Sequence, residues 1–371
     1  MPRCRHDFDS RVEAIKCTVQ SMSTARMLGL AIACLVSLSC GTNAQQVKLK
    51  AALQVPVSEL FIGQSLAQFK KEVEERTGNG ISIEIFDNGK PYNDAQIVGA
   101  VTSGAVELGV AGFNQFADKI PAVDILEQPF LFNFDALISA AFAPNGELRT
   151  MIEKALLDTM GVRVLWWQPV GNQVFFSKGR DVAGPQQIKD KKIRVFSETM
   201  AKFVNLCGGN PTILTSGAIH DALKDGKVDM AMAAISTVIN RDLWKVSDTI
   251  TRTAHAPIEF LLFINEKTWQ SLAPAHRAAI TEIVKNLEPK VREKAAQTEL
   301  AAYSFAREKG MRVVDLMPHH VAEWRACSSD VLIGYMETTT DLGSRLMGAY
   351  GRLRTAPCCS GGPDSGGSSR R

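Results

Sequence analysis

An arginine lies inside a segment whose other residues are typical of a buried strand. In the stretch KDKKIRVF, residues 189–196, the residues Ile193, Val195 and Phe196 are strand formers. Because side chains alternate across a strand, Arg194 points to the face opposite Ile193 and Val195. A guanidinium placed in this way needs an anion or water as a partner. Arg194 is therefore the first residue to consider for contact with a ligand.

Common catalytic motifs are absent from the sequence. It contains no HExxH, no GxSxG, no P-loop and no GxGxxG that opens a helix after a strand. Asn88-Gly89-Lys90 is followed by a proline, which cannot supply the backbone donor of a phosphate cradle. No set of residues has the spacing of a metal site or a catalytic triad, so we predict neither an enzyme, nor a metal, nor a cofactor.

The histidines were considered as acid–base groups. Those beyond residue 44 are His220, His255, His276, His319 and His320. His220 is next to Asp221 on a predicted helix, where adjacent residues diverge, and this favours a solvated surface position. His255 lies just before a predicted buried strand and is interpreted as a hydrogen-bonded structural histidine near a hinge. The alternative is an exported hydrolase that uses His255 and Glu259.

The N-terminal region, residues 1–44, is interpreted as an upstream extension followed by a signal peptide. Arg26 precedes the apolar run 27–38, and small residues at Thr42 and Ala44 fit cleavage after Ala44 and export to the periplasm. The run is too short to span a bilayer. Residues 1–21 carry acidic side chains that do not suit a signal peptide, so we hypothesise that translation begins at Met22 rather than Met1. A lipoprotein anchored at Cys40 is the alternative, but no leucine precedes this cysteine by three positions.

Charge and composition limit the partners. The chain of 371 residues is 45% hydrophobic, which is sufficient for two domains with real cores. Removal of residues 1–44 takes five of the 42 basic residues and three of the 39 acidic ones, which leaves 37 and 36 and a net charge of +1. This balance gives no electrostatic signature for nucleic acid or for an anionic membrane.

Four cysteines lie beyond residue 44: Cys207, Cys327, Cys358 and Cys359. An exported protein permits a disulfide between Cys207 and Cys327, but nothing in their spacing supports one. Both are interpreted as buried thiols.

Strands and helices alternate along the chain, which indicates a parallel-rich α/β sheet. The first set of predicted strands is 47–53, 81–86, 106–112 and 162–167, and the second set is 173–178, 191–196, 211–215 and 228–234, followed by 258–265. A long helix is predicted from Pro274 to about Lys309, bent at Pro289. The predicted lobes are 45–170 with 259–298 and 171–258 with 299–355, and the polar tail 356–371 is predicted to be disordered.

Several segments resemble the receptors of tripartite ATP-independent periplasmic (TRAP) transporters of the DctP type. ISIEIFDNGKPYNDAQIVGAVTSGAVELGV resembles their region in which an F-x-N-G turn precedes a helix ending in SG, and EQPFLF resembles LPFLF. VAGPQQIKDKKIRVF resembles tPeDlkGlKiRv, while GGNPTIL and ALKDGKVDM resemble lGAnPvpm and aLqtGvvDg. The resemblance is collinear from about Val47 to Leu316.

The resemblance implies a two-lobed α/β fold of the periplasmic binding protein type, with a ligand cleft between the lobes and a long helix spanning both. It implies that Arg194, which matches the arginine of KiRv, binds a substrate carboxylate. A planar guanidinium can hold both carboxylate oxygens with two charge-assisted bonds. The partners implied are an organic acid and the small and large membrane subunits of a TRAP permease, and contact with membrane proteins is peripheral.

Two positions depart from the family pattern. A second family arginine falls on Gln173, and a family asparagine falls on Ala233. These exchanges lower the charge and polarity of the cleft, which favours a monocarboxylate with an apolar or aromatic body over a C4-dicarboxylate or a sialic acid.

The remaining candidate wall residues lie at predicted strand ends, where open α/β sheets bind ligands. They are Tyr92, Phe113, Trp167, Gln168 and Phe196. Core packing is the alternative interpretation for each aromatic residue.

The expected mechanism is capture of the acid by Arg194, closure of the first lobe over it by a hinge near 168–172 and 256–260, and docking on the permease. The alternative within binding proteins is a periplasmic sensor. An alternative to a monomeric receptor is a dimer formed through the C-terminal helix 334–353.

Overall fold

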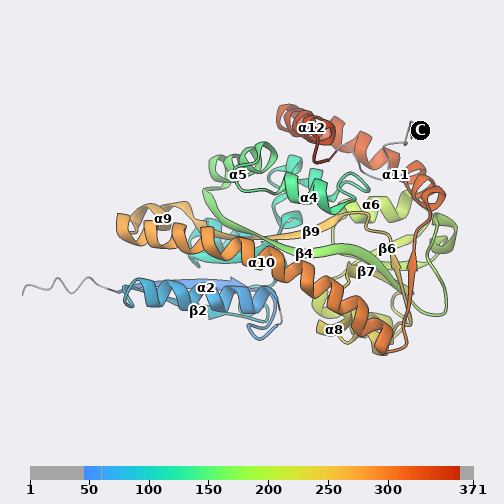
Figure 1. The fold of residues 1–371 in the computed structure, drawn as a ribbon, viewed down its shortest axis with the longest axis horizontal. Coiled ribbons are helices and arrows are strands. Elements are labelled where there is room, and N and C mark those ends of the chain that lie inside the picture. The colour runs from blue at the N-terminus through green and yellow to red at the C-terminus, as the bar shows by residue number, and fades with distance from the viewer. Residues whose placement is uncertain (1–45, 60, 360–371) are drawn as a thin grey trace, which may run out of the picture. The chain divides into compact units, whose positions relative to one another are not determined.

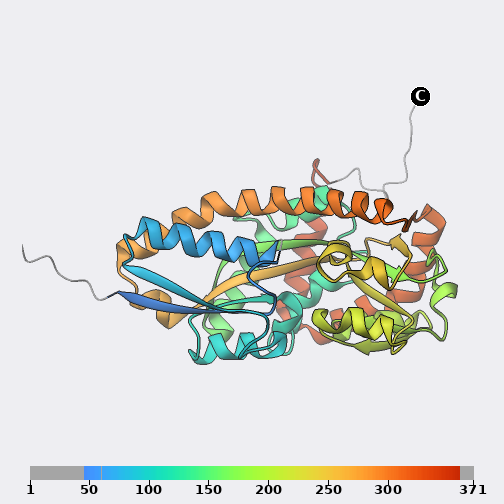
Figure 2. The ribbon, with the colours of Figure 1, turned by 90° about the horizontal axis from the view of Figure 1, so that it is seen from below.

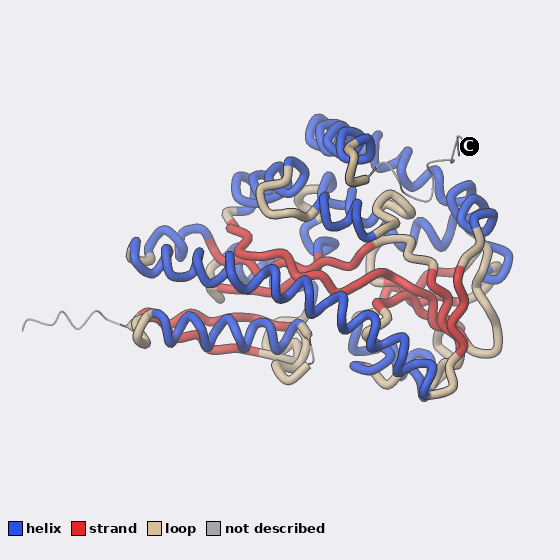
Figure 3. Tube along the Cα trace, viewed as in Figure 1, coloured by secondary structure: helices blue, strands red, loops and turns tan. Residues whose placement is uncertain are grey.

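The computed structural model describes residues 46–59 and 61–359, and residues 47–359 belong to one compact unit. The predicted signal peptide, its cleavage site and the start codon therefore lie outside the described residues. Ten strands of the described residues form one mixed sheet in the order β2-β1-β3-β9-β4-β7-β5-β6, with β8 paired to β4 and β10 paired to β8. Helices lie on both faces of these strands (Figure 3). The α/β, two-lobed prediction is confirmed.

The first lobe is built on the strands β2, β1, β3 and β9 and the first half of β4. The strand pairs β1/β2 and β1/β3 are parallel, whereas β9 is antiparallel to β3 and β4. Two buried apolar clusters fill its two sides, one around Phe116 and Phe132 and one around Leu66 and Phe69. Its elements are β1 (Val47–Leu53), α2 (Ile62–Arg76), β2 (Ile81–Phe86), α3 (Asp94–Ser103), β3 (Leu108–Gly112), η2 (Phe113–Phe116), η3 (Pro121–Glu127), α4 (Asp135–Ala141) and α5 (Glu147–Met160).

The second lobe is built on β6, β5, β7, the end of β4, β8 and β10. The pairs β5/β6 and β5/β7 are parallel, and β7 and β8 are both antiparallel to β4. Phe203 and Trp324 belong to the cluster on one side, and Val174 and Val238 belong to the cluster on the other. Its elements are η4 (Pro185–Ile188), β5 (Lys192–Val195), α6 (Glu198–Leu206), β6 (Asn210–Ile213), η5 (Ser216–Ala218), α7 (Ile219–Lys224), β7 (Met230–Ala234), α8 (Thr237–Asn240), η6 (Leu243–Lys245), β8 (Thr249–Arg252) and β10 (Arg312–Asp315).

Two long strands join the lobes. β9 (Pro257–Asn265) runs beside β4 (Val162–Ser177), a single strand of 16 residues. The sequence predicted two separate strands, 162–167 and 173–178. Pro169 and Gly171, residues that normally weaken a strand, lie between them. This prediction was wrong, since a register shift between Pro169 and Gly171 absorbs both residues as an irregularity of one continuous strand.

The helix α10 (Pro274–Glu308) packs on both lobes. Its residues Ile283, Leu287 and Val291 belong to a first-lobe cluster, and Ala302 and Ala306 belong to a second-lobe cluster. Figures 1 and 2 show this helix running along β4 and β9, with α2 beside its first half. The predicted helix spanning both lobes is therefore confirmed, and Pro289 lies inside it.

A disulfide corrects the interpretation of the two buried cysteines. Cys207, at the end of α6, is bonded to Cys327 on α11 (Pro318–Thr338), with their Cα atoms 5.1 Å apart. The interpretation as buried thiols was wrong because the two residues, 120 positions apart, are brought together only by packing of α11 on α6.

The C-terminal helices contact both lobes. Trp324 of α11 lies in a second-lobe cluster, whereas Tyr335 and, from α12 (Thr340–Thr355), Leu346 belong to the first-lobe cluster around Phe116. Cys359 of the predicted tail is buried in the same cluster, and residues 360–371 lie outside the described residues. The lobe boundaries stay a prediction. The short helix α9 spans Glu266–Ser271. Within the described part of the chain, no helix combines the length and the apolar character needed to cross a membrane.

Candidate functional site

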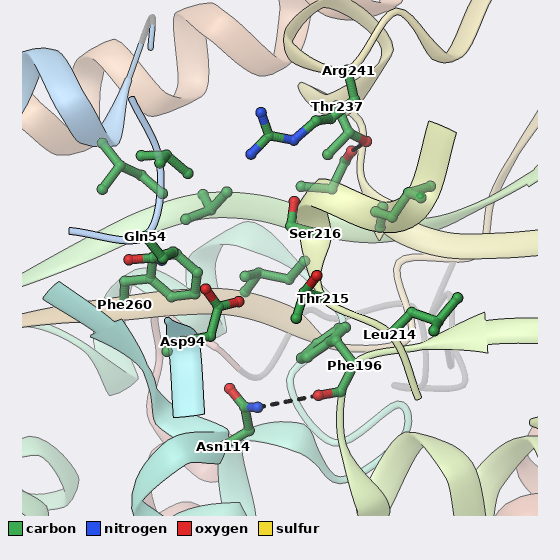
Figure 4. Close-up of a pocket in the computed structure, with 18 of the residues that line it drawn as sticks. Gln54, Asp94, Asn114, Phe196, Leu214, Thr215, Ser216, Thr237, Arg241 and Phe260 are labelled. Carbon is green, nitrogen blue, oxygen red and sulfur yellow. Dashed lines mark hydrogen bonds between the residues drawn. The ribbon is translucent and has the colours of Figure 1, made fainter. Parts of the chain in front are cut away.

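A cavity of about 300 Å³ lies between the carboxyl ends of first-lobe and second-lobe strands (Figure 4). From the first lobe it is lined by the loop after β1, the start of α3, the end of β3 and η2. From the second lobe it is lined by the segments that follow β5, β6 and β7 and by α8. The joining strands contribute Val170, Ile258 and Phe260. Carboxyl ends of strands are the usual ligand-binding edge of open α/β sheets.

Arg194 is buried in the wall of this cavity. It lies on β5, is only 3% exposed, and donates from Nε to the carbonyl of Leu214 (2.9 Å) and from Nη1 to the carbonyl of Met232 (2.7 Å). These two carbonyls orient the guanidinium and use two of its five N–H groups. Its Cζ atom also lies 5.7 Å from the centre of the Phe196 ring. Nη2 has no hydrogen bond to any described residue and can serve a ligand.

Burial weakens the proton affinity of this guanidinium. It lowers the pKa of Arg194 to about 9, while Asp94 opposes the shift and Arg241 adds to it. The group still carries a positive charge at neutral pH. A buried, oriented cation of this kind is a strong attractor for a carboxylate.

Asp94 and Arg241 also line the cavity, from opposite lobes. Asp94 is the first residue of α3, which begins at a capping box made by Asn93 and Gln96. Burial raises the pKa of the Asp94 carboxyl, and the cations Arg194 and Arg241 oppose this. Arg241 follows α8, and its buried Nε has no hydrogen-bond partner in the described residues.

Four hydrogen bonds cross from one lobe to the other around the cavity. Asn240 of α8 donates to Glu59 in the loop before α2, and Asn114 of η2 donates to the carbonyl of Phe196 (3.2 Å, Figure 4). Next to the cavity, Thr199 donates to Asp124 (2.5 Å), and Ser197, the cap of α6, donates to Glu127. These bonds hold the two lobes against each other in the described conformation.

The structure places three of the eight predicted ligand residues on the cavity wall: Arg194, Phe196 and Ala233. Ala233 lies on β7 beside Arg194's partner Met232, where a larger polar side chain would reduce the space. A ligand contact by any of these three stays a prediction.

The structure places the other five predicted residues outside the cavity wall. Trp167 is fully buried against Phe113 with ring centroids 4.6 Å apart, and Tyr92 packs at the edge of the same cluster. Gln168 accepts a hydrogen bond from Trp166 (3.2 Å). For the aromatic residues Trp167, Phe113 and Tyr92 the observed contacts fit the core-packing alternative.

Gln173, the fifth of them, contacts His255 instead of the cavity. Its Oε1 lies 3.1 Å from His255 Nε2, and His255 Nδ1 lies 2.7 Å from Thr253 Oγ1. Burial lowers the pKa of His255 to about 3, so the imidazole is neutral. The prediction of a hydrogen-bonded structural histidine is confirmed. Glu259, its partner in the hydrolase alternative, pairs with Arg292 (3.6 Å).

Asp94, Arg241, Asn114 and Asn240 were not predicted as site residues. Asp94 follows the helix-capping residue Asn93 in KPYNDAQ. This pattern indicates where a helix begins, but it does not show that the beginning of the helix lies on the wall of a cavity. Asn240 is the last residue of α8, a short helix that the sequence did not predict, and Arg241 follows it. No group of three or more residues suited to hold a metal ion is found among residues 46–59 and 61–359.

The fold and the site define a two-lobed binding protein with a cavity between the lobes. The model of the DctP family, described as bacterial extracellular solute-binding protein, family 7, matches residues 55–338. The chain belongs to this family, as the resemblance implied. The family and the structural neighbours are solute-binding receptors and not enzymes.

Three similar proteins illustrate the range of the family. The C4-dicarboxylate-binding periplasmic protein DctP of Vibrio cholerae is 22% identical over 71% of this chain and 78% of its own. The structure of the Bordetella pertussis receptor DctP6, which binds pyroglutamic acid, has a TM-score of 0.77 at 20% identity and covers 82% of this chain and 100% of that one. A TRAP solute-binding protein from Desulfovibrio salexigens with bound orotic acid has a TM-score of 0.76 at 22% identity, covering 83% and 100%.

Proposed function

We propose that this chain is a periplasmic receptor that captures an organic acid, bound as a monocarboxylate, through Arg194 and delivers it to a TRAP permease. The observation that carries the proposal is the buried guanidinium of Arg194, fixed by two backbone carbonyls in the cavity wall with N–H groups to spare. An anion that accepts from those N–H groups relieves the cost of burying the charge.

The balance of charge in the cavity supports one carboxylate rather than two. Arg194 and Arg241 face Asp94, and the remaining lining carboxylate, Glu59, is used by the backbone N–H groups of residues 61–63 and by Asn240. Because neutral groups donate these bonds, Glu59 keeps its negative charge, and the four charged lining residues sum to zero. A cavity without an excess of positive charge disfavours a dianion more than a monoanion. Pyroglutamic and orotic acids, the ligands of two structural neighbours, also carry a single carboxyl group.

The partners follow from the family. We propose that the closed receptor docks on the small and large membrane subunits of a TRAP permease. Export to the periplasm, with cleavage after Ala44, belongs to the same proposal and is supported by relatives named as periplasmic proteins. Closure near 168–172 and 256–260 would use the irregular stretch of β4 at Pro169 and Gly171.

A thermal-shift screen tests the proposal. We expect monocarboxylates of the right shape to raise the Tm of the purified protein in a concentration-dependent way, because a ligand stabilises the folded state by mass action. Arg194→Lys keeps a charge but loses the planar fork, and Arg194→Ala loses both, so each should weaken binding by roughly a hundredfold.

The exposed Arg345 on α12, which pairs with Asp341 (2.9 Å), offers a matched control. Arg345→Ala should leave binding unchanged. Stabilisation by dicarboxylates alone would contradict the monocarboxylate proposal, and a ligand that binds both Arg194 variants with wild-type affinity would show that Arg194 is not the anchor.

A further inference from the structure

We propose that the ligand carries, close to its carboxylate, a hydrogen-bond donor such as a hydroxyl, an amide N–H or an ammonium group, and that Asp94 accepts from it. This inference rests on the proposed function, because it assumes that Arg194 holds the carboxylate. It names the chemical class of the ligand and makes Asp94 the residue that selects it.

Asp94 has a free carboxylate that faces the cavity. No other described residue donates a hydrogen bond to its side chain, whose only hydrogen bond is with its own backbone N–H. Figure 4 shows the carboxylate directed toward the middle of the lining residues. Glu59 differs in this respect, because both of its oxygens are already used within the protein.

Arg194 and Asp94 influence each other electrostatically across the cavity without pairing. Each shifts the pKa of the other, yet in the described part of the chain they form no ion pair. Opposite charges that face one cavity without contact leave room for a bridging molecule. A bridging ligand must offer an acceptor to Arg194 and a donor to Asp94.

A second acceptor on the same wall supports this arrangement. Gln54, from the loop after β1, lines the cavity, and its buried Oε1 has no hydrogen-bond partner among the described residues. On the opposite wall, the buried Nε of Arg241 likewise has none. The first lobe thus presents acceptors and the second lobe presents donors.

This polarity discriminates between classes of acid. An acid without a donor would cover the Asp94 carboxylate with apolar atoms and deprive it of water, which costs free energy. A second carboxylate near Asp94 would be repelled by it. An acid with a hydroxyl, lactam or amino group near the carboxylate satisfies both walls.

The test uses matched pairs of acids that differ in the donor. Calorimetric titration compares mandelate with phenylacetate and pyroglutamate with 3-oxocyclopentanecarboxylate, in which a methylene replaces the N–H, on the purified protein without residues 1–44. For at least one pair we expect the donor-bearing acid to bind roughly tenfold to a hundredfold more tightly, the range for a hydrogen bond to a charged group. In Asp94→Asn and Asp94→Ala this preference should shrink to less than about threefold.

The control is Asp221→Asn, which removes an exposed carboxylate from α7 that does not line the cavity. It should keep the wild-type preference. Equal binding of the two members in both pairs by the wild type, or a preference that survives Asp94→Ala, overturns the inference while leaving the proposed function in place. If no acid binds the wild type, or if binding is the same in Arg194→Ala, the proposed function itself fails.

Discussion

Glu127 is a buried carboxyl group whose charge state depends on pH. It accepts a hydrogen bond from Ser197 at the start of α6, and burial, with the neighbouring Asp124, raises its pKa to about 8. Because this pKa lies above the ordinary value of 4.5, the folded state binds a proton more tightly than the unfolded state. The resulting stability is fully present below about pH 4.5 and is lost as the pH rises through about 8.

Replacement of Glu127 by glutamine should remove this pH dependence. Glutamine is neutral at every pH and its amide oxygen can accept from Ser197, so we expect Glu127→Gln to be more stable than the wild type at pH 8 by at least about 1 kcal/mol and similar at pH 5. Guanidinium unfolding at both pH values measures the difference. Glu259, whose pKa burial also raises to about 8, should leave some pH dependence in the variant. Parallel pH profiles for the two proteins would show that Glu127 is ionised in the folded state.

The site was predictable only where local sequence decides the direction of a side chain. Arg194 could be found because strand alternation separates it from Ile193 and Val195, both fully buried in the structure. Asp94 and Arg241 face the same cavity because the two lobes lie against each other. A local sequence pattern does not predict such an arrangement. Trp167 was predicted to line the cavity. It lies on a joining strand, but its side chain is fully buried and packs in the core.

The disulfide links α6 to α11, which packs against it. Cys207 ends α6, whose start at Ser197 follows the strand that carries Arg194. The bond closes a loop of 120 residues, and a loop of that length restricts the unfolded chain by roughly 4–5 kcal/mol in the entropy model. We therefore expect the bond to contribute to stability more than to the shape of the cavity.

Removal of this disulfide is tested by the double substitution Cys207→Ala and Cys327→Ala. We expect a lower free energy of unfolding by roughly 2–5 kcal/mol and unchanged affinity for the ligand. Dithiothreitol should lower the Tm of the wild type and leave that of the double variant unchanged. The matched control is Cys358→Ala, which removes an exposed cysteine that forms no disulfide and should unfold like the wild type. An identical Tm for the disulfide-free variant would contradict the prediction.

Most elements were predictable because the apolar residues of each recur with the spacing of a helix or a strand, and because the residues at its ends mark where it stops. The helix α3 is capped at its start by Asn93 and at its end by Gly104, whose φ of +79° suits glycine. β4 was predicted as two strands because its continuity depends on pairing with β9 and not on its own residues. The short strands β8 and β10 were missed for the same reason: each consists of four residues that become a strand by pairing with a neighbour.

At the scale of the molecule, binding and closure use the same segments. Glu59 is held by the first N–H groups of α2 and accepts from Asn240 of the opposite lobe. Asn114 and Asp124 of the first lobe contact residues that directly follow the strand carrying Arg194. A ligand held by Arg194 therefore lies next to the bonds that close the lobes, and it favours closure to the extent that its contacts are better in the closed state.

Asn240 should consequently control how long a ligand stays bound. We expect Asn240→Ala to raise the dissociation rate of a bound acid roughly fivefold, the value of about 1 kcal/mol for one hydrogen bond, with little change in the association rate. Asn240→Asp should raise it further, because two carboxylates would then face each other across the closed lobes. Stopped-flow fluorescence measures both rates, and Asn205→Ala, an exposed change on α6, is the control. If Asn240→Asp released the ligand no faster than Asn240→Ala, the contact with Glu59 would not be part of closure, and the effect of Asn240 would come from the ligand alone.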